Sequence, residues 1–224
     1  MQIKAVALDV DGTLYPNSCM YLKSIPFALT HLRLMRQYGR VRREVRKIRP
    51  LDDLRETEAT MLAERLGISP AEAAGRVNEE IHGTWEATLD RVPLFPHVRE
   101  VLVALREAGM RLGVLSDFPV TQKLKRLGLD RLFDAGLWSE DTGYLKPHPE
   151  PFIEIARLLG SAPGQVLFVG NSYSYDIIGA HDAGMATAHV ARRAATGSVA
   201  DLTFFDYRDL AAWVLSRAGP GAAP

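Results

Sequence analysis

The sequence contains one cysteine, Cys19, among its 224 residues. A single cysteine excludes an intramolecular disulfide, and with it a small fold held together by disulfide bonds. We therefore expect a reducing, cytoplasmic location. The sequence also lacks a run of about 18 uninterrupted apolar residues, so we expect no membrane span. We also expect no secretory signal, because the apolar N-terminal stretch reaches Asp9 too early.

An excess of charge of either sign is also missing. Lys and Arg together number 27, as do Asp and Glu, so the formal net charge is zero. Nucleic-acid binding driven by bulk charge is therefore not expected. The content of 47% hydrophobic and 24% charged residues excludes a disordered or collagen-like chain. At roughly 150 residues per domain, the length predicts one domain that carries a sizeable insertion.

Short apolar runs alternate with helical patterns along most of the chain. The runs cover residues 3–10, 111–116, 165–170, 186–190 and 202–205. The helical patterns cover residues 98–108, 151–159 and 175–183. Strands that alternate with helices of this length predict an α/β fold with an open, Rossmann-like parallel sheet.

The stretch of residues 15–93 contains no convincing strand pattern. An apolar stripe with helical spacing runs through Leu34, Tyr38, Val41, Val45 and Ile48. Further helices are predicted over residues 51–66 and 70–89, the second with Ser69 as its N-cap. We therefore predict a sheet-containing core of residues 1–14 and 94–217, a helical insertion of residues 15–93, and a flexible tail of residues 218–224.

Polar residues collect where the predicted strands end, which is where open α/β sheets bind their ligands. Asp9 and Asp11 follow the first strand and are close enough to share one small volume. Two carboxylates so close repel each other, so the site needs a cation, and Mg²⁺ is the natural candidate. Asn171 and Asp176 follow a later strand at the same edge.

The same edge carries groups that suit an anion. The backbone N–H groups of Gly12 and Thr13 are expected to be free to cradle it. Ser116 supplies a hydroxyl donor and Lys146 a positive charge. A nucleophile, an acid/base group, a metal and anion-stabilising donors together predict phosphoryl transfer.

These residues resemble the four motifs of the haloacid dehalogenase (HAD) superfamily, in the same order along the chain. Residues 9–13 are similar to the first motif, Ser116 to the second, Lys146 to the third and residues 170–176 to the fourth. The resemblance covers most of the chain outside the insertion. The insertion itself resembles the small helical cap that this superfamily carries after its first motif.

The resemblance implies a mechanism and a set of metal ligands. Asp9 would attack phosphorus and form an aspartyl-phosphate, and Asp11 would act as the acid and then as the base. Mg²⁺ would be held by the Asp9 carboxylate, the Asp11 carbonyl and a side chain of the fourth motif. Asn171 stands where the superfamily usually has an aspartate, so we expect weaker Mg²⁺ binding, with Asp176 as a remaining ligand.

Three other interpretations stay open at this point. The dehalogenases proper use no metal, but they also lack the second aspartate of the first motif, and Asp11 is present here. A phosphate-binding or regulatory protein on the same fold is the second alternative, with catalysis weakened at Asn171. A helical insertion that binds nucleic acid is the third, and it predicts binding that depends strongly on salt.

Several side chains also have plainer interpretations. Asp176 would stabilise a helix N-terminus, and Asp117 is expected to cap the helix that follows it. A dense group of basic residues is expected to form a solvated helix face, with Asp52, Asp53, Glu56 and Glu58 as partners; a polyanion-binding patch is the alternative. The basic residues are Arg33, Arg36, Arg40, Arg42, Arg43, Arg46, Lys47 and Arg49.

The sequence as a whole predicts a Mg²⁺-dependent phosphatase that acts on a small phosphorylated metabolite. It indicates neither the individual substrate nor the oligomeric state.

Overall fold

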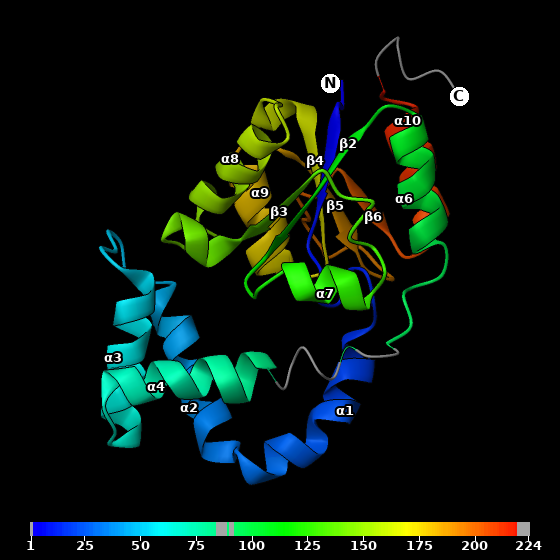
Figure 1. Ribbon diagram of the computed structural model, residues 1–224. Coiled ribbons are helices and arrows are strands. Elements are labelled where there is room, and N and C mark those ends of the chain that lie inside the picture. Colours follow the sequence, from blue (N-terminus) through cyan, green and yellow to red (C-terminus); the bar gives the residue numbers. More distant parts are fainter. Residues whose placement is uncertain (1, 84–88, 90–91, 219–224) are drawn as a thin grey trace.

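The computed structural model describes residues 2–83, 89 and 92–218. Its centre is a parallel sheet of six strands in the order β3-β2-β1-β4-β5-β6 (Figure 1). The strands are β1 (Ala5–Leu8), β2 (Arg111–Ser116), β3 (Ala135–Trp138), β4 (Val166–Gly170), β5 (Ala186–Val190) and β6 (Leu202–Phe204). The predicted α/β, Rossmann-like fold is therefore confirmed. The sequence missed β3, a short edge strand whose four residues include only one buried side chain.

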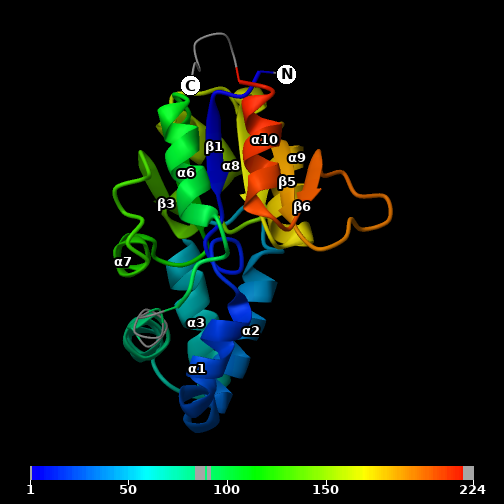
Figure 2. The ribbon, with the colours of Figure 1, turned by 90° about the vertical axis from the view of Figure 1, so that its right-hand side faces the viewer.

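Helices cover both faces of the sheet (Figures 1 and 2). One face packs against α6 (Val98–Glu107) and α10 (Tyr207–Leu215), and the other packs against α8 (Pro149–Leu158) and α9 (Ile178–Asp182). The side chains of β1 alternate between the two cores. Val6 and Leu8 belong to the first, Ala5 and Ala7 to the second. This burial on both faces explains why the strand is a continuous apolar run in the sequence.

The segment after β1 is helical and lies beyond the carboxyl edge of the sheet (Figure 1). It consists of α1 (Asn17–Thr30), α2 (Leu32–Val45), α3 (Leu54–Leu66), α4 (Pro70–Arg76) and the π-helical turn η1 (Val77–His82). We call these residues, 17–82, the helical segment. It has its own apolar core, to which Leu145 of the sheet-containing part contributes. The division of the chain into domains stays a prediction.

The sequence predicted this segment only in part. Ser69 caps α4 as expected, with its hydroxyl accepting from the Glu72 N–H at 3.2 Å. The helix α1 could not be recognised individually from the sequence, because only Met20 and Ser24 of this helix are buried. Ile48 was wrongly placed on the apolar stripe: α2 ends before it, and its side chain is exposed. Residues 84–88 of the helix expected over 70–89 lie outside the described residues.

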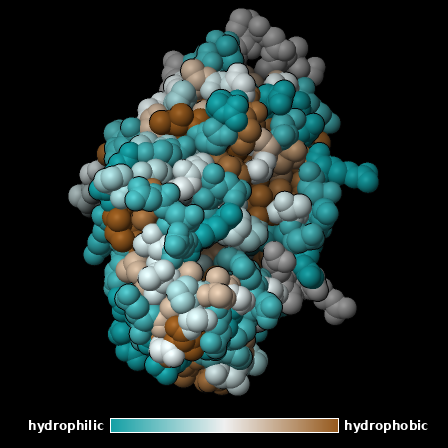
Figure 3. All heavy atoms as spheres, turned by 60° about the vertical axis from the view of Figure 1, so that its left-hand side comes forward, coloured by the Kyte–Doolittle hydropathy of each residue, from teal (hydrophilic) through white to brown (hydrophobic). Residues whose placement is uncertain are grey.

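Shorter elements connect these layers. They are the helix α7 (Thr121–Arg126), the 3-10 turns η2 (Ser139–Thr142) and η3 (Pro163–Gln165), and the π-helical turn η4 (Tyr173–Ile177). At the C-terminus, Ala218 of the expected tail forms a bridge with Ile3, and residues 219–224 lie outside the described residues. No helix in the described part of the chain is long and apolar enough to span a membrane. The face in Figure 3 is mostly hydrophilic, with hydrophobic side chains in separate patches.

Candidate active site

A cavity of about 420 Å³ lies at the carboxyl end of β1. The strand order reverses on the two sides of β1, and such a switch point is where doubly wound sheets bind ligands. Six of the predicted site residues line this cavity: Asp9, Asp11, Ser116, Lys146, Asn171 and Asp176. Gly12 and Thr13 do not appear among its lining residues. The fold thus brings together groups that are up to 167 positions apart in the chain, counted as 176 − 9.

Asp9 is a buried carboxylate with a partner on each oxygen. Lys146 Nζ donates to Oδ1 at 2.8 Å, and the Thr13 hydroxyl donates to Oδ2 at 2.9 Å. Burial raises the pKa of Asp9 to about 7, with further repulsion from Asp176 and Asp11, although Lys146 opposes this shift. Asp9 is therefore held in one orientation in a site that is rich in negative charge.

Asp11 is held by groups that come from three elements. The Tyr15 hydroxyl donates to Oδ1, and the Lys123 ammonium donates to Oδ2. The Ser116 hydroxyl lies 3.4 Å from Oδ2. Lys123 is almost completely buried on α7, and the sequence analysis missed it. Its short helix carries a second lysine, Lys125, and no pattern in the sequence separates the two.

Lys146 and Asp176 form the next part of the site. Lys146 Nζ donates to Asp176 Oδ1 at 2.6 Å, so one ammonium bridges Asp176 and Asp9. Asp176 Oδ2 also accepts from the Ser172 N–H at 2.9 Å, so the expected role near a helix start exists beside the site role. The close approach requires a glycine at 170, because a Cβ there would lie 2.3 Å from the Asp176 Cβ.

The hydrogen bonds of the turn at residues 12–13 differ from those predicted. The Thr13 N–H donates to the Val10 carbonyl at 3.3 Å, so this N–H is not the free anion donor that we expected. The hydroxyl of Thr13 orients Asp9 instead. Gly12 has φ +84°, and a Cβ there would lie 2.3 Å from Asn171 Nδ2. Glycine at this position therefore allows Asn171 to approach the first motif.

The donor set of this cavity fits a hard cation. The described residues include no group of three or more His, Cys, Asp or Glu side chains that could hold a metal ion. Asn171 does, however, line the same cavity as Asp9 and Asp176, and its amide oxygen lies 3.4 Å from the Thr13 hydroxyl that donates to Asp9. Four carboxylates line the cavity, those of Asp9, Asp11, Asp117 and Asp176, and three cationic groups pair with them, those of Lys146, Lys123 and Arg46. This leaves an excess of negative charge and oxygen ligands of the kind that Mg²⁺ prefers.

The sequence predicted that Asp117 caps the following helix, and the structure shows other partners for it. Its Oδ1 accepts from the Ser139 hydroxyl at 2.6 Å and from the Lys146 N–H at 3.2 Å. Its Oδ2 accepts from Arg46 Nη2 at 2.5 Å. Burial alone would raise the pKa of Asp117, but Arg46, Lys146 and Arg42 outweigh burial and hold it well below its usual range. Asp117 is therefore a buried anion that joins the helical segment to the site.

The basic residues of α2 are not simply a solvated face. Arg42 is buried, donates to Glu58 Oε1 at 3.1 Å and to the Asp117 carbonyl at 2.6 Å, and pairs with Glu140. The expected solvated face is therefore wrong for Arg42 and for Arg46, although Glu58 is a partner as predicted. The charges of Arg42 and Arg46 are removed from water here, and each is paired with an acidic residue of the sheet-containing part of the chain.

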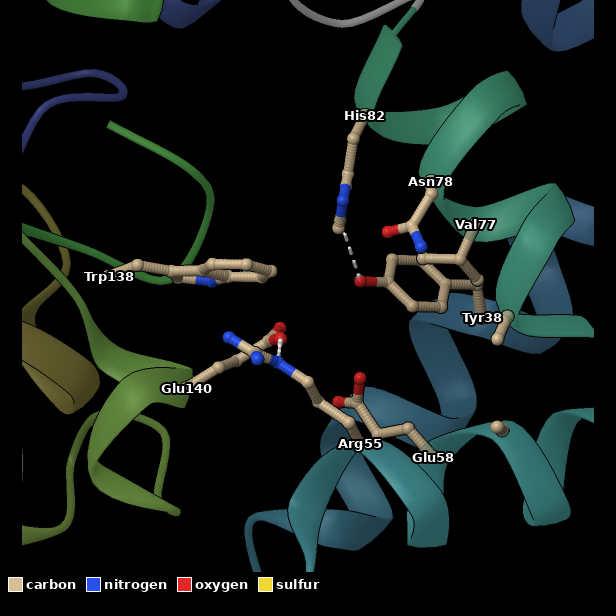
Figure 4. A pocket seen from close by; sticks show the side chains of 10 residues that line it. Tyr38, Arg55, Glu58, Val77, Asn78, His82, Trp138 and Glu140 are labelled. Atoms are coloured by element: carbon tan, nitrogen blue, oxygen red, sulfur yellow. Dashed lines mark hydrogen bonds and ion pairs between the residues drawn. The ribbon is translucent and has the colours of Figure 1, made fainter. Parts of the chain in front are cut away.

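A second cavity, of about 250 Å³, lies at the same boundary (Figure 4). Trp138 and Glu140 enter it from one side, and Tyr38, Glu58 and His82 enter it from the helical segment. His82 Nε2 lies 3.4 Å from the Tyr38 hydroxyl. Burial lowers the pKa of His82 to about 4, with help from the positive charges of Arg42, Lys123 and Arg55.

The depressed pKa of His82 predicts a loss of stability in acid. The unfolded chain binds a proton at His82 below about pH 6.5, whereas the folded protein resists it down to about pH 4, so stability falls as pH decreases through this window. We expect wild type to lose about 2–3 kcal/mol more unfolding free energy than His82→Gln between pH 7 and pH 4.5. Urea titrations at both pH values measure this difference.

The opposite pH trend of Glu58, whose pKa burial raises to about 7, is shared by both proteins and cancels in the comparison. Equal losses in wild type and variant would show that His82 is not the group that titrates.

Comparisons with known proteins agree with this geometry. A family model for haloacid dehalogenase-like hydrolases matches residues 3–184. The chain belongs to this family. It is 34% identical over 206 residues to the glyceraldehyde 3-phosphate phosphatase of Methanopyrus kandleri, covering 85% of this chain and 84% of that protein. It is 33% identical over 201 residues to the phosphoglycolate phosphatase of Salmonella typhimurium, covering 81% and 79%.

Two solved structures extend the comparison. The HAD phosphatase of Thermococcus onnurineus has 26% identity and a TM-score of 0.62, with 96% of this chain and 99% of that chain covered. The 2-haloacid dehalogenase of Pseudomonas syringae pv. Tomato DC3000 has 25% identity and a TM-score of 0.70, with the same coverage. The family match and the similarity to curated phosphatases together identify the chain as a hydrolase, more specifically a phosphatase.

Proposed function

We propose that this hydrolase cleaves phosphomonoesters of small cytoplasmic metabolites through an aspartyl-phosphate on Asp9, with Mg²⁺ as cofactor. The observation that carries the proposal is the single cavity onto which Asp9, Asp11 and Lys146 open together. A fixed carboxylate, a second carboxylate beside it and an ammonium are the groups that phosphoryl transfer needs. The resemblance to curated phosphatases supports the same reaction.

In this mechanism Asp9 and Asp11 divide the work. Asp9 Oδ attacks phosphorus as the bond from phosphorus to the ester oxygen breaks. Asp11 gives a proton to the leaving oxygen, and for this step it must first take up a proton in place of its ion pair with Lys123. Asp11, now a carboxylate, then takes a proton from the water that attacks the aspartyl-phosphate, which releases inorganic phosphate and restores Asp9. Lys146 and Ser116 stabilise the charge on the phosphoryl oxygens.

Four oxygen donors would hold the cation. They are the Asp9 carboxylate, the Asp11 carbonyl, the Asn171 amide oxygen and Asp176. When bound, Mg²⁺ supplies positive charge that offsets the repulsion between Asp9 and the phosphoryl oxygens. Because Asn171 is uncharged, we expect the cation to bind more weakly than at a site with a third carboxylate.

A metal-independent dehalogenase is the second candidate, and the similarity to the Pseudomonas syringae dehalogenase structure favours it. Asp11 supports the phosphatase instead. A departing alkoxide needs a proton, whereas a departing halide leaves as a stable anion. The ion pair of Asp11 with Lys123 keeps a possible acid/base group in the cavity that halide release does not require.

A substrate panel separates these candidates. We expect hydrolysis of p-nitrophenyl phosphate and of at least one member among phosphoglycolate, sugar phosphates and nucleoside monophosphates, and we expect EDTA to lower it by at least about 100-fold. Released phosphate is measured with Mg²⁺ and with EDTA, and chloride release from 2-chloropropionate is measured in parallel.

The three other outcomes identify the alternatives. Chloride release that survives EDTA would establish the dehalogenase. Ester hydrolysis that survives EDTA would overturn the metal assignment alone. Binding of inorganic phosphate without turnover of any ester would favour the phosphate-binding protein.

A further inference from the structure

The backbone of Lys146 is held from both sides, although it lies in a turn outside the helices and strands. Its N–H donates to Asp117 Oδ1 at 3.2 Å. Its carbonyl accepts from Arg46 Nε at 2.8 Å, across 100 positions of the chain. These two bonds hold the backbone from which the Lys146 side chain starts, together with a bond within the turn from the His148 N–H to the Leu145 carbonyl at 3.0 Å.

All three nitrogens of the Arg46 guanidinium group make hydrogen bonds. Nη2 pairs with Asp117, Nη1 donates to the Arg42 carbonyl at 3.1 Å, and the group lies 4.6 Å from the centre of the Tyr175 ring. Nε is the nitrogen that reaches Lys146. Every nitrogen of this rigid group is therefore engaged, which fixes its position in a way that a flexible ammonium would not.

Arg46 belongs to the C-terminal end of α2, whereas Asp117 and Lys146 belong to the sheet-containing part of the chain. Lys146 Nζ in turn lies between Asp9 and Asp176. Lys146 is thus the one residue that connects Arg46 of the helical segment to Asp9, the proposed nucleophile. Displacements of about 1 Å at such a group are enough to lower a rate by about 10²-fold.

We propose that Arg46 is a positioning residue, which places the ammonium of Lys146 when the helical segment docks on the sheet-containing part. The Arg46–Asp117 ion pair does this through the Lys146 backbone: Asp117 accepts from the Lys146 N–H, and Arg46 donates to the Lys146 carbonyl. The site is then complete only in the docked arrangement. This inference rests on the proposed function, in which Lys146 stabilises the phosphoryl group.

Arg49 provides a control, because it bridges the same two parts of the chain without touching Lys146. Its side chain is more exposed than that of Arg46, 48% against 13%, and its Nη1 also lies 3.1 Å from His148 Nδ1. Its guanidinium pairs with Glu150 at the start of α8, with Nη1 and Oε2 3.0 Å apart. It also lies 4.9 Å from the centre of the Tyr144 ring. If Arg46 only attached the helical segment, Arg46→Met would lower the free energy of unfolding but, like Arg49→Met, would leave the kcat of the folded protein near that of wild type.

The test compares these variants with wild type on the best ester of the panel. We expect Arg46→Met to lower kcat by about 30–100-fold, and Arg49→Met to stay within about 3-fold of wild type. Guanidinium added at tens of millimolar is expected to restore part of the kcat of Arg46→Ala, whereas Arg49→Ala gains nothing. Isothermal titration with inorganic phosphate gives a readout without turnover, and Arg46→Met should bind it about 10-fold more weakly.

Asp117→Asn keeps the inference testable if the arginine variants fail to fold. Its amide oxygen still accepts from Ser139 and Lys146, but its amide nitrogen then faces Arg46. We expect this variant alone to lose kcat and phosphate affinity in the same direction. Where Arg46→Met folds, the double variant should lose less than the sum of the two single effects. Thermal unfolding verifies that each variant is folded.

Two results distinguish the inference from the proposed function. If the kcat and the phosphate affinity of Arg46→Met stay within about 3-fold of wild type, the inference is overturned and the proposed phosphatase activity is unaffected. A wild-type protein that binds phosphate but hydrolyses no ester overturns the phosphatase, and weaker phosphate binding by Arg46→Met then still supports the inference.

Discussion

Asp9→Asn is expected to lower the turnover of every phosphomonoester by at least about 10⁴-fold. The amide keeps the shape of the side chain and still accepts from the Thr13 hydroxyl, but its neutral oxygen does not attack phosphorus effectively. Steady-state kcat on the best ester of the panel measures the loss. Acid-quenched wild type should also gain the mass of one phosphoryl group during turnover, and Asp9→Asn should not.

Asp182→Asn provides a matched control, since it makes the same change at an exposed aspartate on α9. We expect it to behave as wild type. Retention of activity by Asp9→Asn to within about 100-fold of wild type, or a phosphoryl group on that variant after quenching, would assign the nucleophile to another residue.

Lys123→Met is expected to have the second largest effect, on activity and on stability. Lys123 is nearly fully buried and pairs with Asp11, whose side chain is 15% exposed. Removing the ammonium leaves a partly buried carboxylate without its ion pair, which costs up to about 3–5 kcal/mol for a buried pair. It also frees Asp11 from its fixed orientation, so we expect kcat to fall by about 10²-fold. Urea unfolding and steady-state kinetics measure the two effects.

Lys125→Met is the control on the same helix, because Lys125 is exposed. It should change kcat by less than about 2-fold and the unfolding free energy by less than about 0.5 kcal/mol. If Lys123→Met matched Lys125→Met in both measurements, Asp11 would be oriented by its other partners alone. In that case the Tyr15 hydroxyl would be the group to replace next.

The carboxyl edge of the sheet could be predicted well from the sequence, because the signals for it are local. Each buried strand is a continuous apolar run, and the polar residues that follow a run must lie at one edge when the strands are parallel. For this reason Asp9, Asp11, Ser116 and Asn171 were placed together without any knowledge of distance, whereas Lys146 follows no predicted strand and was assigned to the site from its place before a predicted helix and its resemblance to the third motif. The start of α4 was equally local, since Ser69 and Pro70 lie within a single turn.

Elements with few buried side chains could not be predicted in this way. The exposed surface of α1 removes the apolar periodicity by which a helix is recognised. The edge strand β3 owes its place to pairing with β2, which fixes four residues that have little strand character of their own. Both elements are stabilised by contacts with distant segments.

The partners of buried charges were likewise decided only by the tertiary structure. Lys123 meets Asp11 across 112 positions, and Arg46 meets Asp117 across 71. A lysine on a short helix and an arginine in a basic run have the same local sequence whether they face water or a buried carboxylate. The sequence by itself determined five of the six strands, the edge of the sheet where the polar residues collect, and which chemical groups lie there. The fold alone determined which cations hold those groups in place, because burial and pairing of charge depend on how distant segments pack.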